Sequence, residues 1–379
     1  MIITKIVLEN WKNFRYADVT CGKRVFLIGP NASGKSNFLD ALRFLRDVAE
    51  DGLEKAVDKR GGMKAIRFLS ARQKPDIKIS VTLDDSWEYT LIFGTEKGKQ
   101  IPLVREEEVI KVSDEGRKII LARPDDEDKK DIDRLTQTAL QQVNANVDFR
   151  DIPKFFSTIQ YRHILPQLVR NPEGFSITPV RNDPYGRDLV LQIWKTSPAA
   201  RDRRLNKINK ALKEAVPGLK SLSVKQDENG LPHLEVNYQN WRAHGAYQNE
   251  TTLSDGTLRM LALLWTLLDS GGPLLLEEPE LSLHEGIVQY LPQLFSNMDK
   301  GKKKAVRQVF ITTHSNALLK DSGVGANEVL RLEPDAEGTS IQEPSAEDIA
   351  LMENGLSAAE VLLPRTTPKG AEQFYLFEL

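Results

Sequence analysis

A glycine-rich run near the N-terminus carries the clearest chemistry in the sequence. It fits the pattern G-x-x-x-x-G-K-[ST] and consists of Gly29, Pro30, Asn31, Ala32, Ser33, Gly34, Lys35 and Ser36, with Asn37 next. In this pattern backbone N–H groups point at phosphates, the lysine reaches the β- and γ-phosphates, and the hydroxyl ligates Mg²⁺. Chance produces it about once in a hundred chains of this length. This phosphate loop (residues 29–36) therefore predicts a site for ATP and Mg²⁺.

Two adjacent carboxylates follow an apolar segment much later in the chain. Residues 273–276 are Pro-Leu-Leu-Leu, and Glu277 and Glu278 come next. A phosphate loop needs an acid at the end of a neighbouring parallel strand to hold the Mg²⁺ shell, and a second acid can polarise the attacking water. We assign Glu277 to the metal and Glu278 to the water. The alternative is a solvated turn after a core strand, which the order of the two motifs disfavours.

A second element suited to anions is the serine–glycine turn (residues 253–257). Ser254 can cap the apolar helix 258–268, and Gly256 leaves backbone N–H groups accessible at the helix start. The turn lies about 220 residues after the phosphate loop, and one chain cannot easily wrap both elements around one γ-phosphate. Two chains arranged head to tail can do so. The alternative is an ordinary capped core helix.

One histidine follows a third apolar segment, residues 309–313. His314 could hydrogen-bond the γ-phosphate and the attacking water, although a lone histidine at a strand end is usually structural. Its position about 36 residues after Glu278 favours the catalytic reading.

The elements that position these groups can be read from periodicity. Strands are expected at 2–8, 24–28, 76–83, 87–93, 101–112, 219–225 and 233–238, and helices at 38–48, 200–215 and 258–268. The charged run 124–134 should be solvated and open a helical stretch to about residue 146. Four segments result: a first lobe with the phosphate loop and an antiparallel sheet (1–123), a short helical insertion (124–155), a second lobe with the other motifs (156–335) and a tail (336–379).

Composition narrows the function classes. Among 379 residues there is one cysteine, Cys21, so an internal disulfide is excluded and a reducing, cytoplasmic location is expected. The net charge of −2 gives no global sign of nucleic-acid binding. Apolar runs are too short for a membrane span, so no membrane partner is expected. No heptad array is present, which excludes long coiled-coil arms.

Taken together, the motifs resemble the RecF-like and chromosome-structuring branch of the ABC ATPases, and most closely the short ATPases related to the overcoming-lysogenization-defect family. The resemblance is carried by LENWKNF (8–14), GPNASGKSN (29–37), LSDGTLRML (253–261), and LLLEEPELSLH (274–284) with ITTHS (311–315). It implies an α/β P-loop NTPase of the ABC-ATPase head type, with an antiparallel β subdomain and a helical insertion. It also implies a homodimer closed by ATP.

The resemblance further implies roles for single residues. Ser254 and Gly256 would act on the partner's nucleotide, residues 280–284 would form the D-loop, and Lys12 with Asn13 would lie near the adenine or ribose. Gln160, or else Gln73, would be the metal-side glutamine. Two departures stand out. Glu277 replaces the usual aspartate, which could slow turnover, and the C-terminal nuclease of the full-length relatives has no counterpart after His314.

Three functions follow from this reading. The first is a DNA-responsive ATPase in DNA repair or phage defence, with a separately encoded effector such as a nuclease or toxin. The second is a slow ATP-gated sensor or scaffold. The third, a transporter ATPase subunit, is disfavoured because those proteins usually carry a Ser-Gly-Gly-Gln signature.

Two basic clusters could bind duplex DNA or be solvated faces. The first consists of Arg201, Arg203, Arg204, Lys207 and Lys210, and the second of Lys302, Lys303, Lys304 and Arg307. The apolar residues 374–377 should pack on the chain itself or on a partner.

Overall fold

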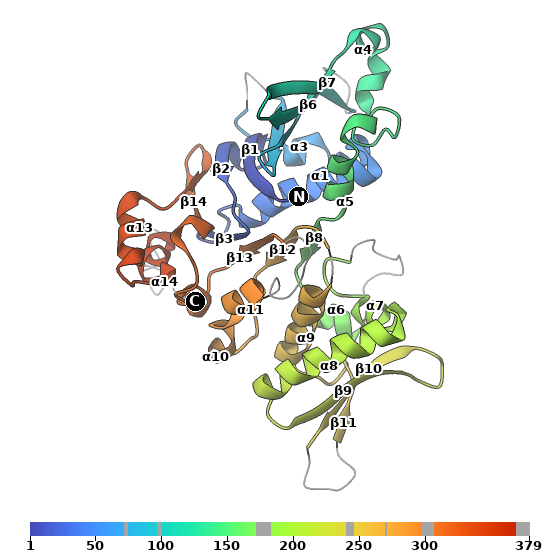
Figure 1. The fold of residues 1–379 in the computed structure, drawn as a ribbon, viewed down its shortest axis with the longest axis vertical. Coiled ribbons are helices and arrows are strands. Elements are labelled where there is room, and N and C mark those ends of the chain that lie inside the picture. Colours follow the sequence, from blue (N-terminus) through green and yellow to red (C-terminus); the bar gives the residue numbers. More distant parts are fainter. Residues whose placement is uncertain are drawn as a thin grey trace, which may run out of the picture. The chain divides into compact units, whose positions relative to one another are not determined.

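The computed structural model describes residues 1–71, 75–96, 101–171, 183–239, 246–269, 271–297 and 307–368. The chain forms two compact units (Figure 1). The first unit comprises Met1–Ile159, Gly271–Leu275 and Gly301–Leu379, and the second comprises Gln160–Ser270 and Leu276–Lys300. The alternative glutamine Gln73, the lysines at 302–304 and the apolar residues 374–377 lie outside the described residues.

An antiparallel sheet forms one half of the first unit (Figure 1). In spatial order its strands are β2 (Phe14–Thr20), β1 (Ile3–Trp11), β4 (Ile77–Leu83), β5 (Trp87–Thr95), β6 (Pro102–Ser113) and β7 (Gly116–Arg123). The predicted strands of this region are confirmed. Sequence periodicity did not indicate β2 or β7, and β7 lies at the sheet edge with both faces largely exposed, so it has no apolar–polar alternation.

A second sheet carries the phosphate loop. Its order is β15 (Gly338–Gln342), β14 (Val329–Asp335), β3 (Arg24–Ile28), β13 (Val309–Thr312), β12 (Leu274–Glu277) and β8 (Gln160–Arg162). Strand β3 runs parallel to β13 and β14, and β15 is antiparallel to β14. Strand β12 begins in the first unit and ends in the second, to which β8 belongs.

The helices of the first unit pack on a core that is mainly aliphatic and includes a cluster of aromatic rings. They are α1 (Lys35–Asp51), α2 (Leu53–Asp58), α3 (Met63–Ile66), α4 (Asp126–Lys130), α5 (Asp151–Ser157), α12 (Asn316–Leu319), α13 (Ala346–Glu353) and α14 (Ala358–Val361), with short 3₁₀ turns η1 (Ile132–Thr136), η2 (Val147–Phe149), η4 (Ala326–Glu328) and η5 (Leu363–Thr366). Phe44 of α1 lies 5.2 Å, between ring centroids, from both Trp11 and Phe93. This packing fixes α1, and with it the end of the phosphate loop, against the antiparallel sheet.

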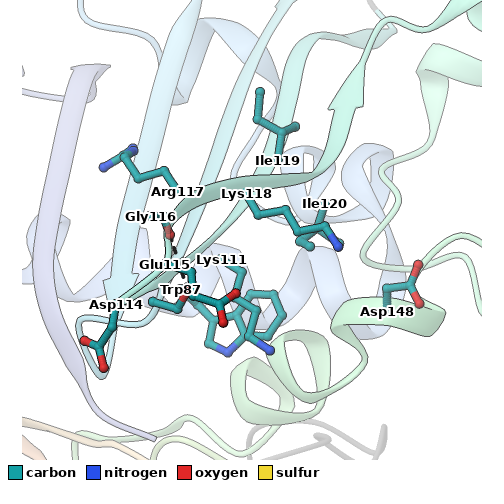
Figure 2. Close-up of a pocket in the computed structure, with 11 residues that line it drawn as sticks. Trp87, Lys111, Asp114, Glu115, Gly116, Arg117, Lys118, Ile119, Ile120 and Asp148 are labelled. Atoms are coloured by element: carbon teal, nitrogen blue, oxygen red, sulfur yellow. Dashed lines mark hydrogen bonds between the residues drawn. The ribbon is translucent and has the colours of Figure 1, made fainter.

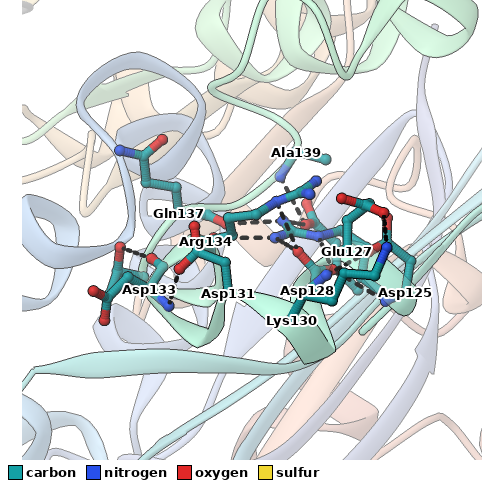
Figure 3. A network of polar contacts seen from close by, with 12 residues as sticks. Asp125, Glu127, Asp128, Lys130, Asp131, Asp133, Arg134, Gln137 and Ala139 are labelled. Carbon is teal, nitrogen blue, oxygen red and sulfur yellow. Dashed lines mark hydrogen bonds and ion pairs between the residues drawn. The ribbon is translucent and has the colours of Figure 1, made fainter.

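The charged run after β7 differs from the prediction of a solvated helical stretch. Only the short α4 and η1 form there, and Asp128 is fully buried. Figure 3 shows the polar network around Asp128. Its carboxylate accepts two hydrogen bonds from Arg123, at 2.8 and 2.9 Å. Arg123 also reaches the buried Glu107 at 3.2 Å. Because a buried carboxylate requires such a partner, this network ties the insertion to the edge of the sheet.

The second unit combines helices with a three-stranded sheet. Its elements are α6 (Pro166–Arg170), α7 (Leu189–Lys195), α8 (Pro198–Ala215), β9 (Leu219–Gln226), β10 (Pro232–Tyr238), β11 (Ala246–Gln248), α9 (Asp255–Leu268), α10 (Glu285–Val288) and α11 (Leu291–Asn297). The predicted strands 219–225 and 233–238 and the predicted helices 200–215 and 258–268 are confirmed. The buried face of α8, Leu205, Ile208 and Leu212, packs in one core with α9.

Among the residues that the structure describes, no helix is both long and apolar enough to cross a membrane.

Candidate nucleotide site

The phosphate loop joins β3 to α1 through two glycines that no other residue could replace without strain. Gly29 has φ 155° and Gly34 has φ 95°, both values that L side chains rarely adopt. A Cβ on Gly34 would lie 2.0 Å from Asn13 Nδ2, and one on Gly29 would lie 2.6 Å from the Leu332 carbonyl oxygen. The loop is thus a tight cradle whose shape requires both glycines.

Two polar groups inside the cradle suit an anionic ligand. The Lys35 ammonium donates hydrogen bonds to the carbonyl oxygens of Gly29 and Pro30, at 2.9 and 3.0 Å. Ser33 is fully buried, and none of the described residues hydrogen-bonds its Oγ. A buried hydroxyl in this state costs free energy, which a phosphate oxygen would remove. With the N-terminus of the 17-residue helix α1 beside them, these groups fit a nucleoside triphosphate.

The N-terminal motif LENWKNF (residues 8–14) forms hydrogen bonds with the phosphate loop and with the first turn of α1. Trp11 Nε1 donates to the Asn37 carbonyl oxygen at 2.8 Å. The Asn13 amide donates to the Ser33 carbonyl oxygen at 3.1 Å, and its Oδ1 accepts from Asn37 at 2.7 Å. The structure therefore brings Asn13, Asn37 and the phosphate loop together, and the motif positions the loop.

Lys12 lies close to α1, where its ammonium pairs with a carboxylate of that helix. Its ammonium forms a 2.7 Å ion pair with Asp40, which also accepts from Arg60 at 2.9 Å. Burial alone would raise the pKa of Asp40, but Arg60 and Lys12 outweigh it and hold that pKa below its usual range. Asp40 was not singled out from the sequence, because a carboxylate inside a helix gives no local signal of its distant partners.

His314 follows β13 at the edge of the sheet where the phosphate loop begins. Thr312 pairs with Leu27 in the parallel ladder, and the Thr313 N–H donates to the Leu27 carbonyl oxygen at 3.1 Å. Since parallel strands end at the same edge, the exposed His314 lies at the same end of the sheet as Gly29.

The acidic strand end belongs to the second unit. Glu277 is the last residue of β12, and Glu278 follows with φ 42°, a left-handed value that is uncommon and costly for a residue with a Cβ. Arg259 of α9 interacts electrostatically with Glu278 and Glu280. Burial lowers the pKa of Arg259, an effect that these carboxylates oppose, and no described residue accepts a hydrogen bond from its Nε.

The serine–glycine turn is rigid and accessible. Ser254 caps α9 as predicted, since its Oγ accepts from the Thr257 N–H at 3.2 Å, and it is exposed. A Cβ on Gly256 would lie 2.7 Å from the Ser282 carbonyl oxygen, so that segment requires a glycine here. Arg170 of α6 clamps the turn through the Leu253 carbonyl oxygen at 2.6 Å and Asp255 at 2.5 Å. No motif in the sequence indicated this arginine.

Gln160 opens β8, the strand beside β12 in the sheet order. The hydroxyl of the next residue, Tyr161, donates a hydrogen bond to the Glu277 carboxylate. A three-residue strand has no periodicity from which this contact could be predicted. The predicted residues thus form two sets, with the phosphate loop, Lys12, Asn13 and His314 on the first unit and Gln160, Glu277, Glu278, Ser254 and Gly256 on the second.

A separate groove of about 920 Å³ lies on the β6–β7 hairpin (Figure 2). None of the predicted site residues lines it. Its charged residues balance, since the bases are Lys111, Arg117 and Lys118 and the acids are Asp114, Glu115 and Asp148. This balance gives no charge preference on which to assign a ligand.

Comparison with known families agrees with this geometry. The family described as "AAA domain, putative AbiEii toxin, Type IV TA system" matches residues 24–320, which include both the phosphate loop and His314. The chain belongs to this family. No curated protein sequence matches the chain.

Solved structures show the fold of this AAA-family chain. An SMC head bound to the C-terminal winged-helix domain of ScpA is 14% identical, with a TM-score of 0.52, and the match covers 92% of this chain and 99% of that one. The SMC head domain from Thermotoga maritima, at 14% identity and TM-score 0.45, matches over 91% of this chain and all of its own length. A Pyrococcus furiosus SMC head bound to a C-terminal domain of ScpA matches at 11% identity, with TM-score 0.49 and 93% and 98% coverage.

The family match and the SMC head with TM-score 0.52 confirm the predicted fold class and family resemblance. The chain is an α/β P-loop NTPase of the AAA family, and its fold is similar to that of an SMC head. Its longest described helix, α8, has 18 residues, so the described part of the chain includes no long coiled-coil arm.

Proposed function

We propose that the chain binds ATP with Mg²⁺, hydrolyses it, and closes as a head-to-tail homodimer over two nucleotides. The observation that carries this proposal is the preformed cradle: two glycines at positive φ, a buried serine hydroxyl and a lysine ammonium converge where β3 meets α1. Membership of the AAA family supports the choice of ATP.

Each predicted residue has a distinct part in this chemistry. Lys35 would exchange its two loop carbonyls for the β- and γ-phosphates. Ser36 and Glu277 would hold Mg²⁺, which when bound neutralises developing phosphate charge. Glu278 would accept the proton of the attacking water. His314 would orient that water by a hydrogen bond.

The head-to-tail arrangement is supported by the serine–glycine turn. Ser254 is exposed, while Arg170 and Ser282 fix the turn within its own unit. A rigid, accessible helix N-terminus is suited to the γ-phosphate held by another chain. We expect cooperation with a separately encoded effector, in repair or phage defence, because the family description names a toxin and toxin–antitoxin system and an SMC head is solved with ScpA bound.

Duplex DNA is the expected trigger, and α8 is the surface that would meet it. Arg203, Lys207 and Lys210 are exposed at helical spacing, whereas Arg201 and Arg204 of the predicted cluster stack on Trp194 and Trp265. Arg307 of the second cluster donates to the Gly272 carbonyl oxygen at 3.0 Å. Among the described residues of the two clusters, the exposed cations without an aromatic neighbour are therefore those of α8, Arg203, Lys207 and Lys210.

Reversing these three charges should weaken duplex binding strongly. The variant Arg203→Glu/Lys207→Glu/Lys210→Glu is expected to bind DNA about tenfold or more weakly and to reduce the slope of log K against log salt by about three. Fluorescence anisotropy over a salt series measures both quantities. The matched control, Lys55→Glu/Lys64→Glu/Lys118→Glu, changes three exposed lysines of the first unit by the same charge. Equal losses in both variants would show that net charge, and not α8, governs binding.

A slow ATP-gated sensor is the second candidate. A glutamate at position 277, in place of the usual aspartate, favours low turnover. Steady-state hydrolysis with and without duplex DNA separates the two candidates, since only the first requires stimulation.

A mixing experiment tests the head-to-tail dimer. Chains carrying Lys35→Ala and chains carrying Ser254→Arg should each be inactive alone. In mixed dimers both defects fall on one nucleotide and the other site is intact, so an equal mixture should recover about a quarter of wild-type turnover. Turnover is measured after tagged pull-down has shown that mixed dimers form.

The reverse mixture provides the control. A chain carrying both substitutions, mixed with wild type, spoils both sites of a head-to-tail dimer and should add no turnover. If the first mixture stays inactive while mixed dimers of the second hydrolyse ATP, both motifs act within one chain and the proposed arrangement is wrong.

A further inference from the structure

Two residues in and just after β8 form hydrogen bonds with Glu277, the predicted metal-side acid. The Tyr161 hydroxyl donates a hydrogen bond to Oε2 of Glu277. His163 Nδ1 lies 3.3 Å from the Glu277 carbonyl oxygen, which can only accept, so the imidazole is the donor. Tyr161 is buried, 6% exposed, and Glu277 is half-buried. All three residues belong to the second unit, so the contact is internal to one compact body.

The strand geometry separates Tyr161 from the predicted glutamine. Side chains alternate along a strand, so Gln160 and Arg162 point to one face of β8 and Tyr161 to the other. The Arg162 guanidinium donates to the carbonyl oxygens of Tyr161 and Asp183, at 3.1 and 3.3 Å. These bonds fix the backbone that carries the tyrosine.

We propose that Tyr161 is a positioning residue for Mg²⁺, one that allows a glutamate to serve where the related pattern has aspartate. This inference rests on the proposed function. Glutamate has one more rotatable bond than aspartate, and ordering it costs entropy. The charge-assisted bond to Oε2 fixes the end of the longer side chain, so that less entropy is lost when the carboxylate is ordered for the metal. Outer-shell partners of this kind change metal affinity about 10- to 100-fold.

Tyr161→Phe removes the hydroxyl and keeps the ring. With a non-hydrolysable ATP analogue present, its affinity for Mn²⁺, measured by electron paramagnetic resonance, should fall about tenfold, and the Mg²⁺ needed for half-maximal hydrolysis should rise in parallel. Binding of the analogue in EDTA should not change. The matched control is Tyr247→Phe, at a 62% exposed tyrosine of the same unit, which should leave Mn²⁺ affinity unchanged.

Glu277→Asp tests the same contact from the other side. Aspartate is one methylene too short to keep the bond to Tyr161, so the proposal predicts about tenfold weaker Mn²⁺ binding although aspartate is the usual residue. Equal or tighter Mn²⁺ binding would overturn it. Because the bond is already lost, adding Tyr161→Phe to Glu277→Asp should cause no further loss, and additive losses would also overturn it.

These measurements distinguish failure of the inference about Tyr161 from failure of the proposed ATP site. A wild-type chain that binds no nucleotide would refute the ATP site itself. A wild-type chain that binds the analogue and Mn²⁺, together with a Tyr161→Phe variant of unchanged Mn²⁺ affinity, would refute the role of Tyr161 and leave the ATP site standing.

Discussion

Replacing Lys35 by alanine is expected to lower the affinity for ATP by about a hundredfold or more. The lysine ammonium is buried in the cradle, 7% exposed, and its two present acceptors are loop carbonyls that a phosphate can replace. Loss of two hydrogen bonds to charged groups, about 1.5 to 3 kcal/mol each, corresponds to this change. Isothermal titration calorimetry measures the affinity.

The control for Lys35→Ala is Lys55→Ala, which removes an exposed lysine of α2. It should bind ATP as the wild type does. Melting curves of both variants show whether the cradle still folds. Wild-type affinity in a folded Lys35→Ala chain would contradict the assignment of the phosphate loop.

Replacing Glu278 by glutamine is expected to leave ATP binding nearly unchanged and to slow hydrolysis by about 100- to 10,000-fold, the usual contribution of a general base. Glutamine keeps the size of the side chain and the left-handed backbone at φ 42°, but it cannot accept the proton of water. Single-turnover hydrolysis and calorimetry separate the two effects.

The matched control is Glu285→Gln, at an exposed glutamate in the first turn of α10. It should hydrolyse ATP at the wild-type rate. If Glu278→Gln also retains that rate, Glu278 is not the base, and Glu277 or water alone must serve.

Local patterns predicted the scaffold well where one face of an element is buried. Strand β4 alternates buried and half-buried residues, and α1 buries Phe38, Leu42 and Leu45 at helical spacing, so both were found. The edge strand β7 was missed because neither face is consistently buried. Likewise, β15, α13 and α14 lie in a segment of mainly polar sequence that gave no strong periodicity.

Contacts between charged residues that are distant in the chain could not be predicted from the sequence. Asp128 stands in a run of charges and was expected to be solvated, yet it is buried and paired with Arg123, which also reaches Glu107. Lys12 was expected near the adenine or ribose from resemblance, and its ion pair with Asp40 depends on how β1 meets α1. The glycine and lysine pattern of the phosphate loop, by contrast, specifies its own local geometry, so it could be read directly.

The most direct test of the account is the mass of the Glu278→Gln chain in solution. By light scattering, this variant should have the mass of one chain, 42.7 kDa, without nucleotide and twice that mass with ATP and Mg²⁺. Adding Ser254→Arg should keep it at the mass of one chain while ATP still binds. A Glu278→Gln chain that binds ATP and retains the mass of one chain would contradict the ATP-closed dimer.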